Sequence, residues 1–466
     1  MKQTLYVLSF LIIFSLFGVQ CTFFKGDRNE EIFWENPAVL DLDEIVKRGY
    51  IRAIVDNSST SYYIYKGRRM GYEFEMLRNL ASRLGVKLHL IVKSDIQEAF
   101  YLLNKGKVDI IAMNLETIEE RKKYGHFTYP LGELGTVLVQ KKGEHMVSSL
   151  KELDRQIIHI RKDAVYKAQL CKIQEENDIH LSIVDEIGDH NHFVQKVLTG
   201  DIAFTVLDQM DATVKAAEHT DLDVSVEISP KKEVAWMLRK NAPQLEAAVN
   251  EWVMEKSGSG YFRTVHAKYY QNRNNNHFRT NSSFSSNGGN KISPYDEMIK
   301  KAAENIGWDW RLLASLVYKE SNFDTTAVSV KGAQGLLQLM PVTLARFGVQ
   351  NPNDPGESLM GGVNYLKYLD KFWRERIPEH NERIKFILAS YNIGQGHVED
   401  AWRLALKYGR NPQNWQEVGH FLKLKTKPEF YKDPVVKSGF AKGHVAFEYV
   451  EEVLLLYDSY RTLINP

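Results

Sequence analysis

One glutamate stands where a carboxyl group could donate a proton. The segment from Trp308 to Glu320 carries apolar residues at three- and four-residue spacing, which in a helix form one stripe that Glu320 ends. The stripe consists of Leu313, Leu316 and Val317. An apolar wall desolvates a carboxyl group and raises its pKa, because burial disfavours the charged form. Glu320 is therefore the candidate acid for a reaction near neutral pH.

The N-terminal segment predicts export. Lys2 is the only charge before an apolar run from Leu5 to Val19, which is shorter than the ~20 residues of a membrane span and typical of a signal-peptide core. We expect residues 1–20 to be a signal peptide. Cys21 follows directly, and this placement resembles the lipobox of bacterial lipoproteins. An uncleaved anchor and a plain cleavage site are the alternatives.

The lipobox resemblance implies that Cys21 is lipidated and that residues 21–39 tether the protein to a membrane, facing the periplasm. Thr22 stands where an Asp would mark inner-membrane retention, which favours the outer membrane over the inner one. Cys171 is the only other cysteine, so no disulfide is expected.

Composition bounds the rest of the chain. With 466 residues, 44% hydrophobic and 26% charged, the sequence predicts a soluble body with more than one domain. Lys plus Arg number 60 and Asp plus Glu number 59, so the chain lacks the excess of positive charge that phosphate backbones require. We therefore expect no nucleic-acid partner.

A stretch rich in Asn, Ser and Gly, residues 271–293, predicts an exposed linker. Residues 40–270 precede it and residues 294–466 follow it. In the first part, strand and helix patterns alternate over 50–55, 72–84 and 86–92, which favours two α/β lobes. The second part is nearly all helical in pattern.

Residues 40–270 resemble the family-3 extracellular solute-binding proteins. The resemblance rests on Gly71-Tyr-Glu-Phe-Glu-Met-Leu77, Leu103-Asn-Lys-Gly-Lys-Val-Asp-Ile110, Phe127-Thr-Tyr-Pro130 and Val197-Leu-Thr-Gly-Asp-Ile202. It implies a periplasmic-binding-protein-like fold in which Arg121 clamps a ligand carboxylate and Asp208 receives an ammonium. Glu116 replaces a hydroxyl residue of the family, so it would repel an anion. We therefore expect a stem peptide or muropeptide, and not a free amino acid, as the ligand.

Residues 294–466 resemble the transglycosylase SLT domain, which implies a lysozyme-like fold. Three motifs occur in family order, Glu320-Ser-Asn-Phe323, Gly332-Ala-Gln-Gly-Leu-Leu-Gln-Leu-Met-Pro341 and Ser390-Tyr-Asn-Ile-Gly394, and the segment from Ser438 to Val450 resembles the closing one. The resemblance makes Glu320 the catalytic residue and Tyr391 its hydrogen-bond partner. It implies that substrate is bound by Ser329, Gln338, Met340, Tyr391 and Asn392.

Two such domains behind a lipid anchor resemble the membrane-bound lytic murein transglycosylase F family. The resemblance implies that Glu320 alone acts as acid and base, cleaving peptidoglycan between N-acetylmuramic acid and N-acetylglucosamine to leave 1,6-anhydro ends. Ordinary glycosidases use two carboxylates. A lysozyme-like hydrolase and a wall-binding or scaffolding lipoprotein with a weak SLT domain stay as alternatives. Neither a cofactor nor a metal is expected, because no ligand-spaced His or Cys motif occurs.

Overall fold

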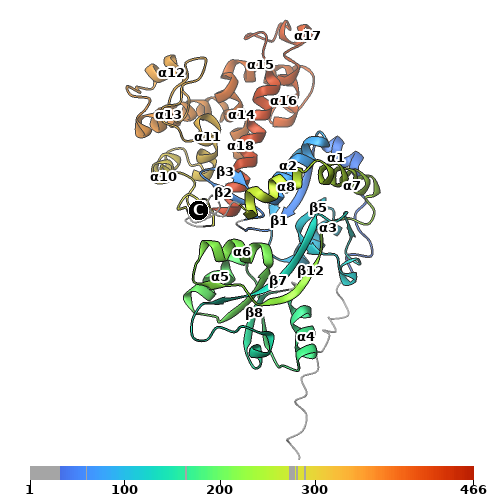
Figure 1. Ribbon diagram of the computed structural model, residues 1–466. Coiled ribbons are helices and arrows are strands. Elements are labelled where there is room, and N and C mark those ends of the chain that lie inside the picture. Colours follow the sequence, from blue (N-terminus) through green and yellow to red (C-terminus); the bar gives the residue numbers. More distant parts are fainter. Residues whose placement is uncertain are drawn as a thin grey trace, which may run out of the picture.

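The computed structural model describes residues 32–58, 60–162, 165–271, 279, 282–287 and 290–465. Residues 41–271 form an α/β domain of two lobes, and residues 296–464 form a helical domain (Figure 1). Both predicted fold classes are confirmed. The expected signal peptide and Cys21 lie outside the described residues.

Lobe 1 is built from strand–helix–strand units. The strand β1 (Tyr50–Val55) pairs in parallel with β4 (Lys87–Val92) and β5 (Ile110–Glu116). Parallel neighbours need a crossover, which α2 (Tyr72–Arg83) and α3 (Ile96–Asn104) supply. The lobe also contains α1 (Leu42–Arg48), a hairpin of β2 (Tyr63–Tyr65) and β3 (Arg68–Met70), η1 (Glu119–Arg121) and β6 (His126–Phe127).

Two long antiparallel strands, β7 (Gly132–Lys141) and β12 (Glu227–Leu238), connect the lobes. They make one sheet of both lobes, in the order β4-β1-β5-β12-β7-β10-β8-β9. Lobe 2 contains η2 (Leu150–Leu153), β8 (Ile157–Arg161), α4 (Tyr166–Asn177), β9 (Ser182–Glu186), α5 (His190–Thr199), β10 (Phe204–Asp208), α6 (Gln209–Glu218) and β11 (Leu222–Asp223). The chain then returns to lobe 1 through α7 (Pro243–Gly258), α8 (Tyr261–His266) and η3 (Ala267–Gln271).

The helical domain packs around its last helix, α18 (Gly443–Leu463), which contacts α11 (Trp310–Ser321), α14 (His380–Ile393) and α16 (Trp415–Leu424). The apolar stripe predicted for residues 308–320 is confirmed, since Leu313, Leu316 and Val317 are fully buried. The remaining helices are α10 (Asp296–Glu304), α12 (Pro341–Arg346), α13 (Pro355–Trp373), α15 (Gln395–Lys407) and α17 (Pro428–Tyr431).

Caps fix both ends of α11. The Asp309 side chain accepts a hydrogen bond from the backbone N–H of Arg311, which satisfies a free donor of the first turn. At the other end Asn322 adopts a left-handed conformation, with φ of 51°. Asn tolerates this conformation better than most residues, so the helix stops directly after the turn that carries Glu320.

The predicted linker is not exposed throughout. In its described part, the Ser286 N–H donates to the carbonyl of Ile64 at 2.9 Å, and the Ile64 N–H donates to the Ser286 hydroxyl at 3.0 Å. Ser285 and Ile292 are fully buried. The expectation was wrong here because the free edge of β2 has unpaired backbone groups, and short polar residues can satisfy them.

The two domains touch at the turn of the β2–β3 hairpin. The Tyr460 hydroxyl, on α18, donates to the carbonyl of Gly67 at 2.6 Å. Gly67 has φ of 75°, and a Cβ built there would lie 2.6 Å from ring atoms of both Phe323 and Tyr318. These two residues flank Glu320 in sequence. Figure 1 shows α18 running from the helical domain onto this hairpin.

Candidate active site

Glu320 lies in the last turn of α11 with its carboxyl group largely removed from water. Burial raises the pKa of Glu320 to about 7, against the opposing effects of a hydrogen bond from Tyr449 and the charge of Lys319. Near neutral pH the group therefore exists in both forms. A carboxyl group in this state can donate a proton and later accept one.

Tyr449 is the hydrogen-bond partner of the catalytic candidate. Its hydroxyl donates to Oε1 of Glu320, and its own pKa lies well above the ordinary value because it is buried beside that carboxyl group. A donor to a carboxylate favours the ionised form. Tyr449 lies in the closing segment that resembles the SLT domain, but 129 residues separate the two, so spacing alone gave no sign of their contact.

Tyr391 does not make the hydrogen bond expected of it. Its hydroxyl donates to the carbonyl of Leu337 on the adjacent loop. It is nevertheless near the site, because burial and the charge of Glu320 both raise its pKa. The prediction of the direct partner was wrong because α18, and not α14, brings its tyrosine within hydrogen-bond distance of Glu320.

Gln338 and Ser329 hold the loop that follows α11. The Gln338 amide donates to the carbonyls of Ala327 and Gly335, at 2.8 and 2.9 Å. The Ser329 hydroxyl accepts the N–H of Ala333 at 2.9 Å. Both side chains therefore shape the loop, while the Gln338 carbonyl oxygen and the Ser329 hydroxyl hydrogen remain for other partners.

Met340 and Asn392 lie at the surface of the same domain. Met340 precedes α12 and is 43% exposed, and Asn392 is exposed near the end of α14. An exposed methionine is available for apolar contact with a ligand. A role for either residue in substrate binding stays a prediction.

The structure brings the two residues predicted to bind a regulatory ligand into one cavity. Arg121 and Asp208 line a cavity of about 50 Å³ between the lobes, and each is 6% exposed. Arg121 also lines a larger cavity of about 570 Å³ at the mouth of the cleft. Burial lowers the pKa of Arg121 to about 10, partly offset by the charge of Glu116. Arg121 thus lines both cavities. We call the smaller one the inner cavity and the larger one the outer cavity.

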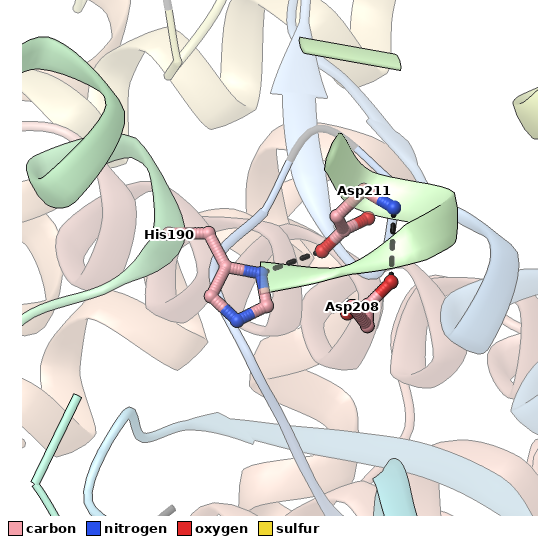
Figure 2. A group of neighbouring side chains, drawn as sticks. All are labelled: His190, Asp208 and Asp211. Atoms are coloured by element: carbon pink, nitrogen blue, oxygen red, sulfur yellow. Dashed lines mark hydrogen bonds and ion pairs between the residues drawn. The ribbon is translucent and has the colours of Figure 1, made fainter. Parts of the chain in front are cut away.

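Asp208 belongs to a cluster with His190 and Asp211 (Figure 2). Asp208 caps α6 by accepting the Asp211 N–H at 2.9 Å, and His190 Nδ1 lies 2.6 Å from an Asp211 carboxylate oxygen. Burial and the Asp211 charge raise the pKa of Asp208 to about 7. A cationic ligand group beside Asp208 would favour its ionised form.

The three side chains offer ligand atoms within 4.8 Å of one another, so their geometry could hold a metal ion. Both carboxylate oxygens of Asp211 already have partners, since Thr60 donates to the one that His190 does not contact. No local motif indicates this cluster, because His190 lies 18 positions before Asp208. The expectation of a chain without a bound metal stays a prediction.

Contacts across the cleft connect the lobes directly. Arg161 of lobe 2 pairs with Asp56 of lobe 1 at 2.5 Å. Glu116, expected to repel an anion, accepts from Gln169 at 2.5 Å and pairs with Lys232 at 3.2 Å. The ammonium of Lys232 thus offsets the carboxylate charge near Arg121.

Comparisons with known proteins match both halves of the chain. The family model of the transglycosylase SLT domain matches residues 297–414, and that of bacterial extracellular solute-binding proteins, family 3, matches residues 51–272. A solved structure of a mutant ArgBP from T. maritima aligns with a TM-score of 0.45 and 21% identity, over 50% of this chain and 100% of that chain.

Relatives similar over most of the chain carry one name. The membrane-bound lytic murein transglycosylase F of Desulfosudis oleivorans is 30% identical over 417 residues, covering 89% of this chain and 90% of that protein. The protein of the same name from Aliivibrio fischeri is 31% identical over 425 residues, covering 90% of this chain and 84% of that protein. The chain therefore belongs to the membrane-bound lytic murein transglycosylase F family.

Proposed function

We propose that the protein is a peptidoglycan lytic transglycosylase in which Glu320 is the single catalytic acid and base. One observation carries the proposal: the pKa of Glu320, raised to about 7 by burial, allows one carboxyl group to serve in both forms. Among the described residues, no second carboxylate is hydrogen-bonded to it. This favours a one-carboxyl mechanism over the two-carboxyl arrangement of ordinary glycosidases.

In the first step, protonated Glu320 donates its proton to the glycosidic oxygen between N-acetylmuramic acid and N-acetylglucosamine. The bond from the muramoyl C1 to that oxygen breaks, and positive charge develops at C1. The acetamido group beside C1 helps to stabilise it. Glu320 is now ionised, and the hydroxyl of Tyr449 donates to the carboxylate.

In the second step, the muramoyl C6 hydroxyl attacks C1 and forms the 1,6-anhydro ring. Its proton passes to Glu320, which returns to the acid form without water taking part. Ser329, Gln338, Met340, Tyr391 and Asn392 are proposed to bind the glycan. Tyr391 acts partly through the Leu337 carbonyl, which keeps the loop of Gln338 beside the catalytic helix.

The products separate this proposal from a lysozyme-like hydrolase. Purified wall treated with the protein should yield muropeptides that end in 1,6-anhydro-N-acetylmuramic acid, identified by mass spectrometry. Reducing ends in their place would establish hydrolysis, and an absence of both would support the scaffolding alternative.

The location in the cell envelope is also a proposal. The relatives are named membrane-bound, while no helix in the described part of the chain is long and apolar enough to cross a bilayer. We propose that lipidated Cys21 holds the protein at the periplasmic face of the outer membrane. Cys21→Ser should release the protein from membranes or stall its processing. Unchanged membrane retention and unchanged gel mobility would contradict lipidation.

For the α/β domain, we propose a sensor of wall-derived peptide or muropeptide. The cavity of about 50 Å³ that Asp208 lines is far smaller than the neighbouring cavity of about 570 Å³ that Arg121 also lines. A ligand would therefore enter the cavity of about 570 Å³ and place a carboxylate on Arg121. To reach Asp208 with an ammonium group, it must widen the inner cavity, which means displacing the Arg161–Asp56 pair.

Such rearrangement could reach the catalytic domain by direct contact. Ser58 and Ser61 line the inner cavity, and the chain runs from them into β2 and on to the Gly67 turn. That turn packs against Phe323 and Tyr318 beside the catalytic glutamate. We propose that ligand binding shifts this contact between a less active and a more active arrangement, which requires that the ligand prefers one of them.

Calorimetry with stem peptides and muropeptides on the full mature chain, paired with turnover assays, tests the sensor. Arg121→Ala should weaken binding at least tenfold and remove the effect of ligand on turnover. Arg263→Ala, which changes an exposed arginine on α8 of the same domain, should alter neither. If no wall fragment binds, or if Arg121→Ala leaves affinity and turnover unchanged, the domain is a spacer or docking module instead.

A further inference from the structure

A further cavity lies between lobe 1 and α18, lined by neither Glu320 nor Arg121. Its volume is about 330 Å³. Lobe 1 contributes Arg69 from β3, Arg78 from α2 and Lys87 from β4, and α18 contributes Glu451 and Glu452. The cavity is therefore basic on one wall and acidic on the other.

The three cations are not ion-paired among the described residues, although the charge of Arg78 acts at longer range on the carboxylate of Glu75. In the same part of the chain, Nη1 of Arg69 is buried without a hydrogen-bond partner. The guanidinium carbons of Arg69 and Arg78 lie 5.2 and 5.7 Å from the centre of the same ring, that of Phe74. Both positive groups therefore lie beside the same apolar ring.

Neighbouring groups respond to this concentration of positive charge. Burial and then the charge of Lys87, followed by three arginines that include Arg69, lower the pKa of His89 to about 4. Burial and Lys87 also lower the pKa of Lys423 on α16. His89 is therefore neutral near pH 7 and adds no charge to the cavity it lines.

The acidic wall does not balance the basic one. Glu452 pairs with Lys319, the residue before the catalytic glutamate. Glu451 alone has no ion pair within the described residues. The three cations of the lining face one carboxylate that is not ion-paired, so the lining carries an excess of positive charge. Arg69 and Lys87 are half-buried and Arg78 is exposed.

We propose that this cavity binds a small multivalent anion bearing phosphate or carboxylate groups, held by Arg69, Arg78 and Lys87 between lobe 1 and α18. The fork of each guanidinium can donate two parallel hydrogen bonds to such a group, and the ammonium of Lys87 adds a third point of contact. The volume accommodates an ion the size of pyrophosphate or citrate. A bound anion would lie on lobe 1 facing α18, the helix that also carries Tyr449.

Titration calorimetry on the full mature chain at low ionic strength tests the site with two probes, pyrophosphate and citrate. One equivalent of at least one of them should bind, and added salt should weaken the binding. Binding of pyrophosphate alone would identify phosphate ligands and binding of citrate alone carboxylate ligands. Failure of both probes to bind at millimolar concentration would overturn the proposal.

Substitutions then locate the ion. Arg78→Gln and Lys87→Gln should each weaken binding about tenfold, as expected for the loss of one charge-assisted contact. Arg410→Gln, at an exposed arginine of the helical domain, is the matched control and should bind as wild type does. Equal affinities for all four proteins would place the ion elsewhere and overturn the proposal.

Glu451→Gln should change the affinity for the anion in the opposite direction. Its carboxylate faces the same cavity and would repel a bound anion, so its removal should tighten binding several-fold. Weaker binding to Glu451→Gln would show that the carboxylate helps to hold the ligand, which contradicts an anion. Because none of these variants alters Glu320 or Arg121, the result is independent of the proposed catalytic and sensor functions.

Discussion

The hydroxyl of Tyr449 donates a hydrogen bond to Oε1 of Glu320, so α18 contacts the end of α11 directly. Opposed influences thereby set the pKa of one carboxyl group. Burial raises the pKa of Glu320, the tyrosine hydroxyl and the charge of Lys319 lower it, and the result is about 7. The balance suits a group that must first lose and then regain a proton in each turnover.

Tyr449→Phe should shift the pH dependence of turnover to higher pH. The substitution removes a donor that favours ionised Glu320, so the pKa rises further and the acid form persists to higher pH. The loss of one hydrogen bond to a charged group corresponds to a shift on the order of one pH unit. The measurement is kcat/KM between pH 5 and 9, and the alkaline limb of this profile should move to higher pH.

Tyr391→Phe is the matched control for that experiment. Its hydroxyl donates to the Leu337 carbonyl, so its loss should lower stability by about 1 kcal/mol and leave the alkaline limb near that of wild type. An equal pH shift in both variants, or a shift in Tyr391→Phe alone, would contradict a direct contact made by Tyr449 only.

The raised pKa of Glu320 also predicts a pH-dependent stability. The pKa of Glu320 in the folded state, about 7, exceeds its pKa in the unfolded state. Glu320 therefore contributes its full stabilisation of the folded state at pH values below the unfolded pKa, and this stabilisation is lost as the pH rises through about 7. Glu320→Gln cannot ionise, so its stability relative to wild type should increase from pH 5 to pH 9 by about 2–3 kcal/mol. Denaturant unfolding at both pH values measures this, and a constant difference would argue against the raised pKa.

The hairpin contact predicts a distinct effect of Gly67→Ala. A Cβ at Gly67 would meet the rings of Phe323 and Tyr318 at 2.6 Å, so the turn must shift away from the segment that flanks Glu320. We expect turnover to fall severalfold. Gly49→Ala is the matched control, since Gly49 has a similar φ of 82° but no atom within 4 Å of the added Cβ. If turnover falls equally in the two variants, strain of the backbone at a positive φ, and not the contact with Phe323 and Tyr318, explains the loss.

Local patterns predicted much of this structure. The stripe that placed Glu320 at the end of a buried helix face needs only helical periodicity within one segment. The motifs near Arg121 and Asp208 also predicted correctly that these residues share a cavity, although lobe 1 and lobe 2 contribute one each.

Long-range packing decided the features that were missed. Whether Tyr391 or Tyr449 reaches Glu320 depends on how α14 and α18 pack around α11, which no local pattern records. Likewise, a Ser-rich segment predicts exposure by composition, yet Ser286 completes the edge of β2 and Ser285 is buried there. The Lys232 ammonium beside Glu116 comes from a strand more than a hundred residues away.

The most direct test of the central claim is the release of anhydro-muropeptides from purified wall by Glu320→Gln. Glutamine keeps the size of the side chain but can neither donate nor accept the catalytic proton, and general acid–base catalysis contributes ~10²–10⁴-fold. We expect turnover of Glu320→Gln to fall below a few per cent of wild type, roughly the smallest loss in that range, with fold and glycan binding retained. Turnover of the folded variant near the wild-type rate would show that Glu320 is not the acid and base.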